Sequence, residues 1–362
     1  MARAPLIDRR SFLKAAGISF TTALTGSQAY ALSRTDGLYA AAFQKPDGSH
    51  GFALVGEDGT VLTEHRLTGR GHGFTTSIAS GWSVAFARSP GNFGYAFRAD
   101  SEAGPVAFSS LENRHFYGHG AFSPQGQILF ATENDFENDV GIIGLYETAN
   151  GFRRIGEFPS GGIGPHEMLL TSDGTGLWVA NGGIVTHPST GKTKLNLDTM
   201  RSNICLIDLK DGSLRAQYAT PSNWQRLSLR HMAIDNSGFV WIGSQHEGAE
   251  TEPAPLVARC GMDDGLTFLD LSAPALGAMR NYVGSVAASD DGKRIAFTSP
   301  TGGTLLIVDA ATGNISGREQ IASVCGVAGR GAGFLKSTET GVMDARKYDE
   351  LWDNHIFKIA GA

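Results

Sequence analysis

The fold is decided by a stretch in the first half of the chain, where four short apolar runs follow one another. In order they read Gly118-His119-Gly120-Ala121-Phe122, Ile128-Leu129-Phe130-Ala131-Thr132, Gly141-Ile142-Ile143-Gly144-Leu145-Tyr146 and Phe152 to Phe158. Each run has the length of a strand, and turn residues such as Ser123-Pro124-Gln125-Gly126 follow the first of them. The stretch therefore predicts four antiparallel strands.

The same pattern recurs along the chain. The first turn reappears as Ser172-Asp173-Gly174, Asp235-Asn236-Ser237-Gly238 and Ser289-Asp290-Asp291-Gly292. His72, His119 and His166 are 47 residues apart, a spacing in the range of propeller blades. The longer distance from His166 to His231 is explained by a polar segment, 186–203, that looks inserted. Residues 32–362 accommodate seven such units, so we predict an all-β, seven-bladed β-propeller in one domain.

The two ends of this region are less regular than its middle. Residues 37–67 contain three strand-like runs, and the last segment, 325–360, begins regularly and ends irregularly. A propeller removes its open sheet edge by closing the ring. We therefore expect one blade to combine strands from both termini.

The first 31 residues read as an export signal. Arg9 and Arg10 precede a short, weakly apolar stretch, 15–24, and Ala29-Tyr30-Ala31 matches a cleavage site. The pattern resembles a twin-arginine leader, which the Tat translocase reads, and predicts a periplasmic location. An ordinary N-terminal helix is the alternative. After residue 31 the sequence contains no run long enough for a membrane helix, so no membrane anchor is expected.

Charge and cysteine content narrow the possible functions. The net charge is −6, which argues against a nucleic-acid partner. Cys205, Cys260 and Cys325 cannot all pair within one chain, and no CxxC or CxxCH motif is present. No nucleophile elbow, phosphate loop or HExxH motif supports a hydrolase or kinase. An enzyme of another class stays possible.

Four histidines occupy equivalent places in successive blades. His72, His119, His166 and His231 each lie at the start of a predicted innermost strand, which points them to the mouth of the central channel. Cys325 has the comparable place in the last blade, and Glu133 ends a second strand on the same face. Imidazole is a ligand for Fe, Cu, Zn and Ni, so these six residues are candidate ligands of a transition metal. The alternative is that the histidines are structural and fix the strand starts by hydrogen bonds.

Further polar residues are predicted at the same rim. They are Arg70, Arg114, His115, Asn134, Glu167, Asn181, Arg230 and His246. Glu167 follows His166 and can orient a neighbouring imidazole, although strand alternation favours the opposite direction for its side chain. The other cysteines, Cys205 and Cys260, are expected in the core. The histidines at 50, 65, 187 and 355 fall in predicted turns, outer strands or insertions, where solvent-exposed side chains are expected.

Several motifs together resemble DUF1513, an uncharacterised family of twin-arginine-exported proteins. They are Arg70-Gly71-His72-Gly73, Arg114-His115-Phe116-Tyr117-Gly118-His119-Gly120, Thr132-Glu133-Asn134-Asp135, Gly162-Ile163-Gly164-Pro165-His166-Glu167, Leu195-Asn196-Leu197-Asp198-Thr199-Met200 and Tyr282-Val283-Gly284-Ser285-Val286. The resemblance implies no established reaction. It implies genes for imelysin-like and di-haem proteins as neighbours, and through them a role in iron handling. Where the family usually has Tyr, this chain has His246, which weakens the case for His246 as a ligand.

Three functions follow from these observations. The first is a periplasmic protein that binds iron or copper for acquisition or handling, with imelysin-like or di-haem proteins as candidate partners. The second is a metal-dependent oxidoreductase or lyase that uses the same rim. The third is a metal-free scaffold that docks other proteins.

Overall fold

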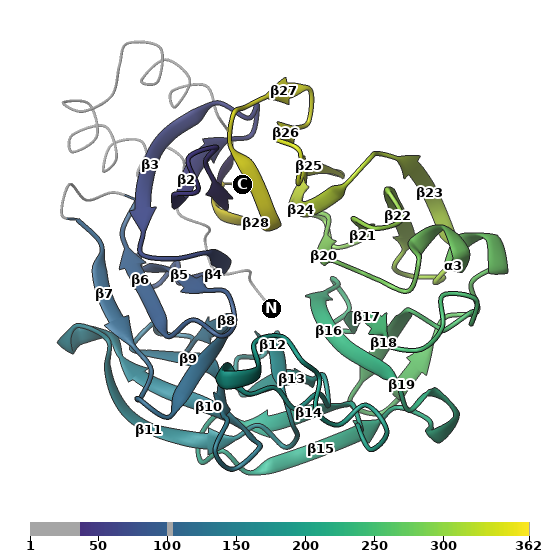
Figure 1. Ribbon diagram of the computed structural model, residues 1–362, viewed down its shortest axis with the longest axis horizontal. Coiled ribbons are helices and arrows are strands. Elements are labelled where there is room, and N and C mark those ends of the chain that lie inside the picture. Colours follow the sequence, from purple (N-terminus) through teal and green to yellow (C-terminus); the bar gives the residue numbers. More distant parts are fainter. Residues whose placement is uncertain (1–36, 100–103, 362) are drawn as a thin grey trace.

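The computed structural model describes residues 37–99 and 104–361. The predicted leader, 1–31, with Arg9 and Arg10, lies outside the described residues. Within them, seven four-stranded antiparallel sheets are arranged around a central axis, as Figure 1 shows. This arrangement confirms the seven-bladed β-propeller expected from the repeats.

Six blades are each built from four consecutive strands, with the first strand innermost. The first three of these blades are β4 (Gly71–Thr76), β5 (Ser83–Ala87), β6 (Phe93–Phe97), β7 (Val106–Ser109); β8 (Arg114–Phe122), β9 (Ile128–Asp135), β10 (Val140–Glu147), β11 (Arg153–Pro159); and β12 (Pro165–Leu170), β13 (Gly176–Asn181), β14 (Asn203–Asp208), β15 (Leu214–Ala219). The next three are β16 (Leu227–Ile234), β17 (Val240–His246), β18 (Val257–Gly261), β19 (Gly265–Phe268); β20 (Ser285–Ala288), β21 (Arg294–Ser299), β22 (Thr304–Asp309), β23 (Ile315–Gln320); and β24 (Val324–Arg330), β25 (Gly333–Thr338), β26 (Val342–Met343), β27 (Arg346–Lys347).

The seventh blade closes the ring with strands from both ends of the described chain. Its innermost strand is β28 (Leu351–Gly361), followed outward by β1 (Gly37–Gln44), β2 (His50–Gly56) and β3 (Val61–Leu67). β28 runs antiparallel to β1, with Gly361 opposite Gly37. The closure expected from the irregular ends is therefore confirmed.

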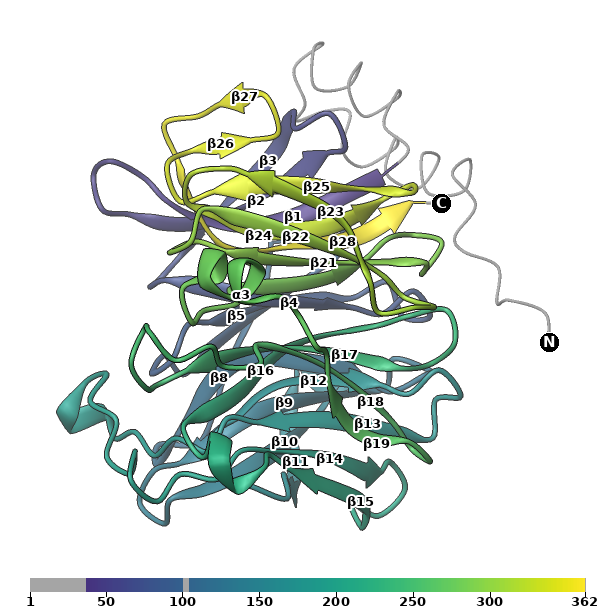
Figure 2. The same ribbon diagram turned by 90° about the vertical axis from the view of Figure 1, so that its right-hand side faces the viewer.

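Helices are short in the described residues. They are the α-helix α3 (Ala273–Met279) and the 3₁₀ helices η1 (Thr148–Asn150), η2 (Pro188–Thr190) and η3 (Ser222–Trp224). No helix within 37–99 and 104–361 has the length and apolar character of a membrane span. Figure 2 shows the propeller edge-on, with the blades stacked in this view and the loops that connect their strands at the two faces of the disc.

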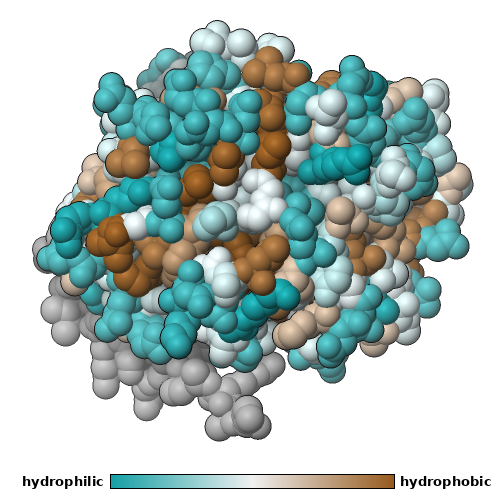
Figure 3. All heavy atoms as spheres, turned by 90° about the horizontal axis from the view of Figure 1, so that it is seen from below, coloured by the Kyte–Doolittle hydropathy of each residue, from teal (hydrophilic) through white to brown (hydrophobic). Residues whose placement is uncertain are grey.

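The core lies between neighbouring blades, not inside one blade. In one cluster Trp241 and Val257 of one blade pack against Phe297 and Leu306 of the next. The outermost strands β11 and β15 alternate exposed with half-buried residues instead. The space-filling view in Figure 3 accordingly shows hydrophilic residues interspersed with smaller apolar areas on the side of the disc. A blade separated from its neighbours would expose both apolar faces to water.

Candidate metal centre

Five innermost strands each send one imidazole to the propeller axis. The residues are His72 on β4, His119 on β8, His166 on β12, His231 on β16 and His355 on β28. The centroids of neighbouring rings are 4.5–6.4 Å apart. We call these five residues the histidine cluster.

The backbone of these strands is irregular where the imidazoles lie. The ladder with the second strand shifts register between Gly71 and Phe74 in β4, between Phe116 and Gly120 in β8, and between Pro165 and Glu167 in β12. The same happens beside His231 in β16, and between Trp352 and Ile356 in β28. Such bulges redirect side chains away from strict alternation and are frequent near functional sites. They allow consecutive residues of an inner strand to face the axis.

Two glycines make room for the close approach of β4 and β8. A Cβ atom on Gly73 would lie 2.3 Å from the Gly118 carbonyl oxygen and 2.8 Å from Nδ1 of His119. Gly118 has a φ of 105°, which side chains other than glycine rarely adopt. The Gly-His-Gly motif in β8 thus serves the packing of the imidazoles.

Most imidazoles of the cluster have a polar partner at Nδ1. Glu167 lies between two of them, with Oε1 3.6 Å from His119 Nδ1 and Oε2 3.3 Å from His231 Nδ1. His72 Nδ1 is 3.2 Å from Asp353 Oδ1, and His355 Nδ1 is 3.1 Å from the Ser285 hydroxyl. A proton held at Nδ1 by such a partner leaves Nε2 with a free lone pair.

The Nε2 atoms are the ones left to bind a ligand. Nε2 of His119 and Nε2 of His355 are buried and have no hydrogen-bond partner among the described residues. Nε2 of His166 and Nε2 of His231 are 3.3 Å apart. Two imidazole nitrogens at bonding distance from one tetrahedral ion are separated by about 3.3–3.4 Å.

Ligand atoms also gather in two overlapping groups of three residues. In each group, the candidate donor atoms all lie within 4.8 Å of one another. One group is His72, His119 and His166, and the other is His119, His231 and His355. The propeller therefore carries histidine groups that can hold a metal ion, and the donor set fits a transition metal.

Burial keeps the cluster in the neutral form that a metal needs. Desolvation lowers the pKa of His119 to about 3, and it holds those of His166, His231 and His355 well below the ordinary value; the other imidazoles of the cluster add to the effect, as does Arg230 for His166 and His231. Burial also raises the pKa of Glu167, and the contact with His119 and the hydrogen bond from the Met232 amide partly offset this. At neutral pH the imidazoles thus present lone pairs without first losing protons.

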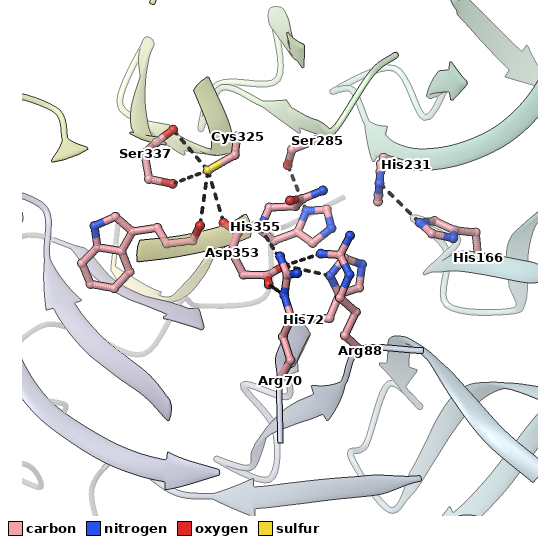
Figure 4. Close-up of polar contacts among 12 residues, drawn as sticks. Arg70, His72, Arg88, His166, His231, Ser285, Cys325, Ser337, Asp353 and His355 are labelled. Atoms are coloured by element: carbon pink, nitrogen blue, oxygen red, sulfur yellow. Dashed lines mark hydrogen bonds and ion pairs between the residues drawn. The ribbon is translucent and has the colours of Figure 1, made fainter. Parts of the chain in front are cut away.

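Asp353 fixes His72 from the other side, as Figure 4 shows. Its Oδ2 accepts a 2.5 Å hydrogen bond from Arg70 Nε, and its Oδ1 accepts a 2.9 Å bond from Arg88 Nη1. Although burial alone would raise the pKa of Asp353, the contact with His72 and the charges of Arg88 and Arg70 hold it well below its usual range. Asp353 is therefore a buried carboxylate that neutralises two arginines.

A cavity of about 310 Å³ opens beside the histidine cluster. His72, His166 and His231 form part of its wall. The connection between β13 and β14, with Lys192 and Lys194, closes another side. Part of the cluster is thus within reach of a small molecule.

Two of the six candidate ligands lie outside the cluster. Cys325 contacts the Ser337 hydroxyl at 3.6 Å and the Asp353 carbonyl oxygen at 3.4 Å, and it packs among apolar side chains of the last blade. Figure 4 shows its sulfur directed to Ser337. Burial raises its pKa to about 12, so the thiol stays protonated. Glu133 instead accepts hydrogen bonds from Tyr146 at 2.6 Å and from Arg154 at 3.0 Å within its own blade.

The other predicted rim residues divide into two sets. Glu167 contacts the cluster, Arg230 lines its cavity, and Arg70 binds Asp353, the partner of His72. The remaining ones have structural partners: Arg114 pairs with Asp135, His115 with Asn134, Asn181 with Ser160, and His246 with Glu252. Cys205 and Cys260 are buried on third strands, as expected.

The sequence-based expectation for His355 was wrong. We expected a solvent-exposed side chain, but His355 is buried and lies at 4.5 Å from His231, measured between ring centroids. Six regular inner strands leave one to be supplied by the C-terminal segment, which is the signal that could have identified it. The short motif Asp353-Asn354-His355 in that segment carries both the imidazole and the carboxylate.

Comparisons with known proteins agree with the architecture. The model of a family described as "Protein of unknown function (DUF1513)" matches residues 65–359. No curated protein matches the sequence. Among solved structures, a hydrazine synthase from Kuenenia stuttgartiensis has a TM-score of 0.61 at 12% identity, over 84% of this chain and 94% of that one. The β-propeller domain of Cps50 (Swd1) from Myceliophteria thermophila has a TM-score of 0.58 at 11% identity, over 88% and 97%. At such identities the likeness concerns the fold alone.

Proposed function

The chain belongs to DUF1513, a family of unknown function, and we propose that this member is a periplasmic protein that binds one transition metal ion, iron or copper, for acquisition or handling. The match confirms the family resemblance found in the sequence. The observation that carries the proposal is the convergence of five imidazoles on the propeller axis, where Nε2 of His119 and of His355 has no partner among the described residues. The ligands would be drawn from His72, His119, His166, His231 and His355.

The arrangement of partners supports a metal rather than a purely structural role. A structural histidine is satisfied when both ring nitrogens have hydrogen bonds, and burial of an unsatisfied one costs about 1–3 kcal/mol. In the cluster, carboxylates and a hydroxyl engage the outward Nδ1 atoms of His72, His231 and His355. The inward Nε2 atoms of His119 and His355 have no such partner among the described residues. A bound cation would satisfy them at once.

The choice of metal rests on the donor set and on the family. An all-imidazole site suits iron and copper as well as zinc and nickel. The gene neighbourhood implied by the family resemblance favours iron, and imelysin-like or di-haem proteins are then the candidate partners. A bound ion would be able to exchange ligands or change its oxidation state. The chain's own residues orient the imidazoles and exclude bulk water.

Elemental analysis tests the proposal directly. Protein isolated from the periplasm should contain about one equivalent of iron or copper. In the double variant His119→Ala/His231→Ala the metal should be lost, whereas His50→Ala/His187→Ala, which changes two histidines outside the cluster, should retain it. Wild-type protein that stays metal-free after isolation and after anaerobic addition of Fe(II) and Cu(I) would exclude the proposal and favour a docking scaffold.

The periplasmic location has its own test. The twin-arginine receptor reads guanidinium groups, and lysine does not reproduce their planar fork. Arg9→Lys/Arg10→Lys should therefore keep the protein in the cytoplasm when cells are fractionated. Unchanged periplasmic levels would count against the twin-arginine route without affecting the metal centre.

A metal-dependent oxidoreductase or lyase is the second candidate. It is favoured by the cavity, which touches His72, His166 and His231 and so gives a small molecule access to the cluster. A pure carrier would accept at most one electron per bound ion from an electron donor and would not turn over. Turnover of a donor that depends on the histidine cluster would identify an enzyme.

A further inference from the structure

The cavity beside the histidine cluster concentrates positive charge in an acidic protein. Arg88, Lys192, Lys194 and Arg230 line it, although the whole chain has a net charge of −6. Two carboxylates partly compensate: Asp353 binds Arg88, and Glu247 binds Lys194 and makes a longer contact of 3.7 Å with Arg230. Lys192, with no carboxylate partner among the described residues, and Arg230, with only this longer contact, therefore keep charge available for a ligand.

Arg230 is the better defined of these two. It directly precedes His231 and shares its bulge in β16, so both residues line the cavity. The guanidinium makes no hydrogen bond among the described residues, its Nε is buried without a partner, and the nearest carboxylate oxygen, on Glu247, is 3.7 Å away. An arginine buried in this way has donors free for an anion, and its planar fork matches a carboxylate.

Lys192 approaches the cavity from a different segment. It lies in the connection between β13 and β14 and forms no ion pair within the described part of the chain. The neighbouring charge of Arg88, followed by partial burial, lowers the pKa of Lys192. Because Lys192 and Arg230 lie on different segments of the cavity wall, a ligand that contacts both cations is favoured if it carries more than one negative group.

The remaining wall supplies hydroxyl donors and apolar surface. Asn354 donates a 2.8 Å hydrogen bond to the Tyr282 hydroxyl, which leaves the hydrogen of that hydroxyl free. Pro90 and Ile184 contribute apolar contacts. Two glycine amides of this wall are already engaged, because Gly182 N donates to the Gly164 carbonyl and Gly191 N donates to the Pro188 carbonyl.

We propose that this cavity is a second binding site, specific for a small polycarboxylate anion, with Arg230 and Lys192 binding separate carboxylate groups and Tyr282 donating a hydrogen bond. The volume, about 310 Å³, is at the lower end for small-ligand sites and suits an anion with two or three carboxylates. The proposal depends on the cavity and not on the metal, so it can be tested in metal-free protein.

The test is a calorimetric titration of metal-free, full-length mature protein with citrate, tricarballylate, malonate and inorganic phosphate. The metal should be removed with a neutral chelator such as phenanthroline, because EDTA is itself a polycarboxylate. We expect one polycarboxylate per protein and an affinity that falls as NaCl is raised. Lys192→Gln and Arg230→Gln should each weaken binding by about tenfold or more, the value of a charge-assisted hydrogen bond.

Lys210→Gln is the matched control, since Lys210 is an exposed lysine in the turn between β14 and β15 and does not line the cavity. Because Arg230 is buried, a thermal melt should check that Arg230→Gln is folded. If Arg230→Gln unfolds, Lys192→Gln alone still decides the test. Absence of polycarboxylate binding, wild-type affinity in both variants, or binding of phosphate alone would overturn the proposal. The metal proposal is judged separately, by whether the same protein takes up metal. Protein that takes up metal but does not bind the anions refutes only the polycarboxylate site.

Discussion

The Nε2 atoms of His166 and His231 face each other at 3.3 Å between the innermost strands of two adjacent blades. Glu167 Oε2 lies 3.3 Å from Nδ1 of His231, and a proton shared there leaves a lone pair on Nε2 of that ring. Two lone pairs at this distance repel unless a proton or a cation lies between them. The pair is thus either a hydrogen bond in the metal-free protein or two ligands of one ion.

Glu167→Gln should weaken metal binding without removing a ligand. An amide can donate a hydrogen to Nδ1 of His231 or His119, which would move the ring proton to Nε2 and block coordination. We expect the affinity for Cu(II) or Zn(II) to fall about 10–100-fold in a competition titration. Glu319→Gln, a change at an exposed carboxylate, is the control. An unchanged affinity would show that Glu167 does not set the tautomer.

His355→Ala should remove metal as effectively as the loss of a predicted ligand. The ring lies 4.6 Å from His72 and 5.0 Å from His119, measured between centroids, and its Nε2 has no other partner among the described residues. Metal content per protein after periplasmic isolation is the measurement, with His65→Ala on β3 as the control. Full metal content in His355→Ala would reduce the ligand set to the four histidines found from the sequence.

The comparison of His355 with His119 shows what the sequence can and cannot predict. Repeat spacing identified the propeller and four of the five imidazoles, because His72, His119, His166 and His231 recur at the same place in blades built from consecutive strands. His355 lies in β28, whose blade takes its other strands from the opposite end of the described chain. Spacing between neighbouring repeats carries no information about such a strand.

A bulge explains why Glu167 reaches the cluster. Strict alternation on β12 would turn Glu167 away from the axis if His166 faces it, yet the register shift between Pro165 and Glu167 allows both to reach the cluster. Cys325 lies at a similar shift in β24, but its small side chain reaches only Ser337 and the backbone of β28. A sequence gives the place of a residue in a repeat and not the local direction of its side chain.

The three cysteines should behave as buried, protonated thiols. Burial raises the pKa of Cys205 to about 11 and those of Cys260 and Cys325 to about 12. Native protein at pH 8 should therefore react slowly with a thiol reagent such as DTNB, and denatured protein should react at all three positions. Rapid labelling of native Cys325 would show an ionised thiol and restore it as a candidate ligand.

The same pKa shifts predict a loss of stability in alkali. In the unfolded chain a thiol ionises near pH 8.5, whereas the folded protein retains the proton to about pH 11–12. The folded state then binds more protons than the unfolded state, so the free energy of unfolding falls as pH rises from about 9 to about 12. Denaturant unfolding of wild type and of Cys260→Ala across this range measures the effect, and the variant should show a weaker dependence. An identical slope in both would contradict the assignment.

Removal of β28 should prevent formation of the propeller. The strand is the innermost one of its blade, pairs with β1 and also contributes Asp353 and His355 to the centre of the molecule. A chain that ends after residue 349 leaves the edge of β1 open. It also exposes Phe43, which packs against Trp352 in the complete protein. We therefore expect no cooperative thermal transition. A circular permutant supplies the control: because Gly361 lies opposite Gly37, a short linker can join them in a hairpin, with new termini between β27 and β28. This permutant keeps every strand and should melt cooperatively and retain metal. A truncated chain that melts like wild type would show that closure by β28 does not determine stability.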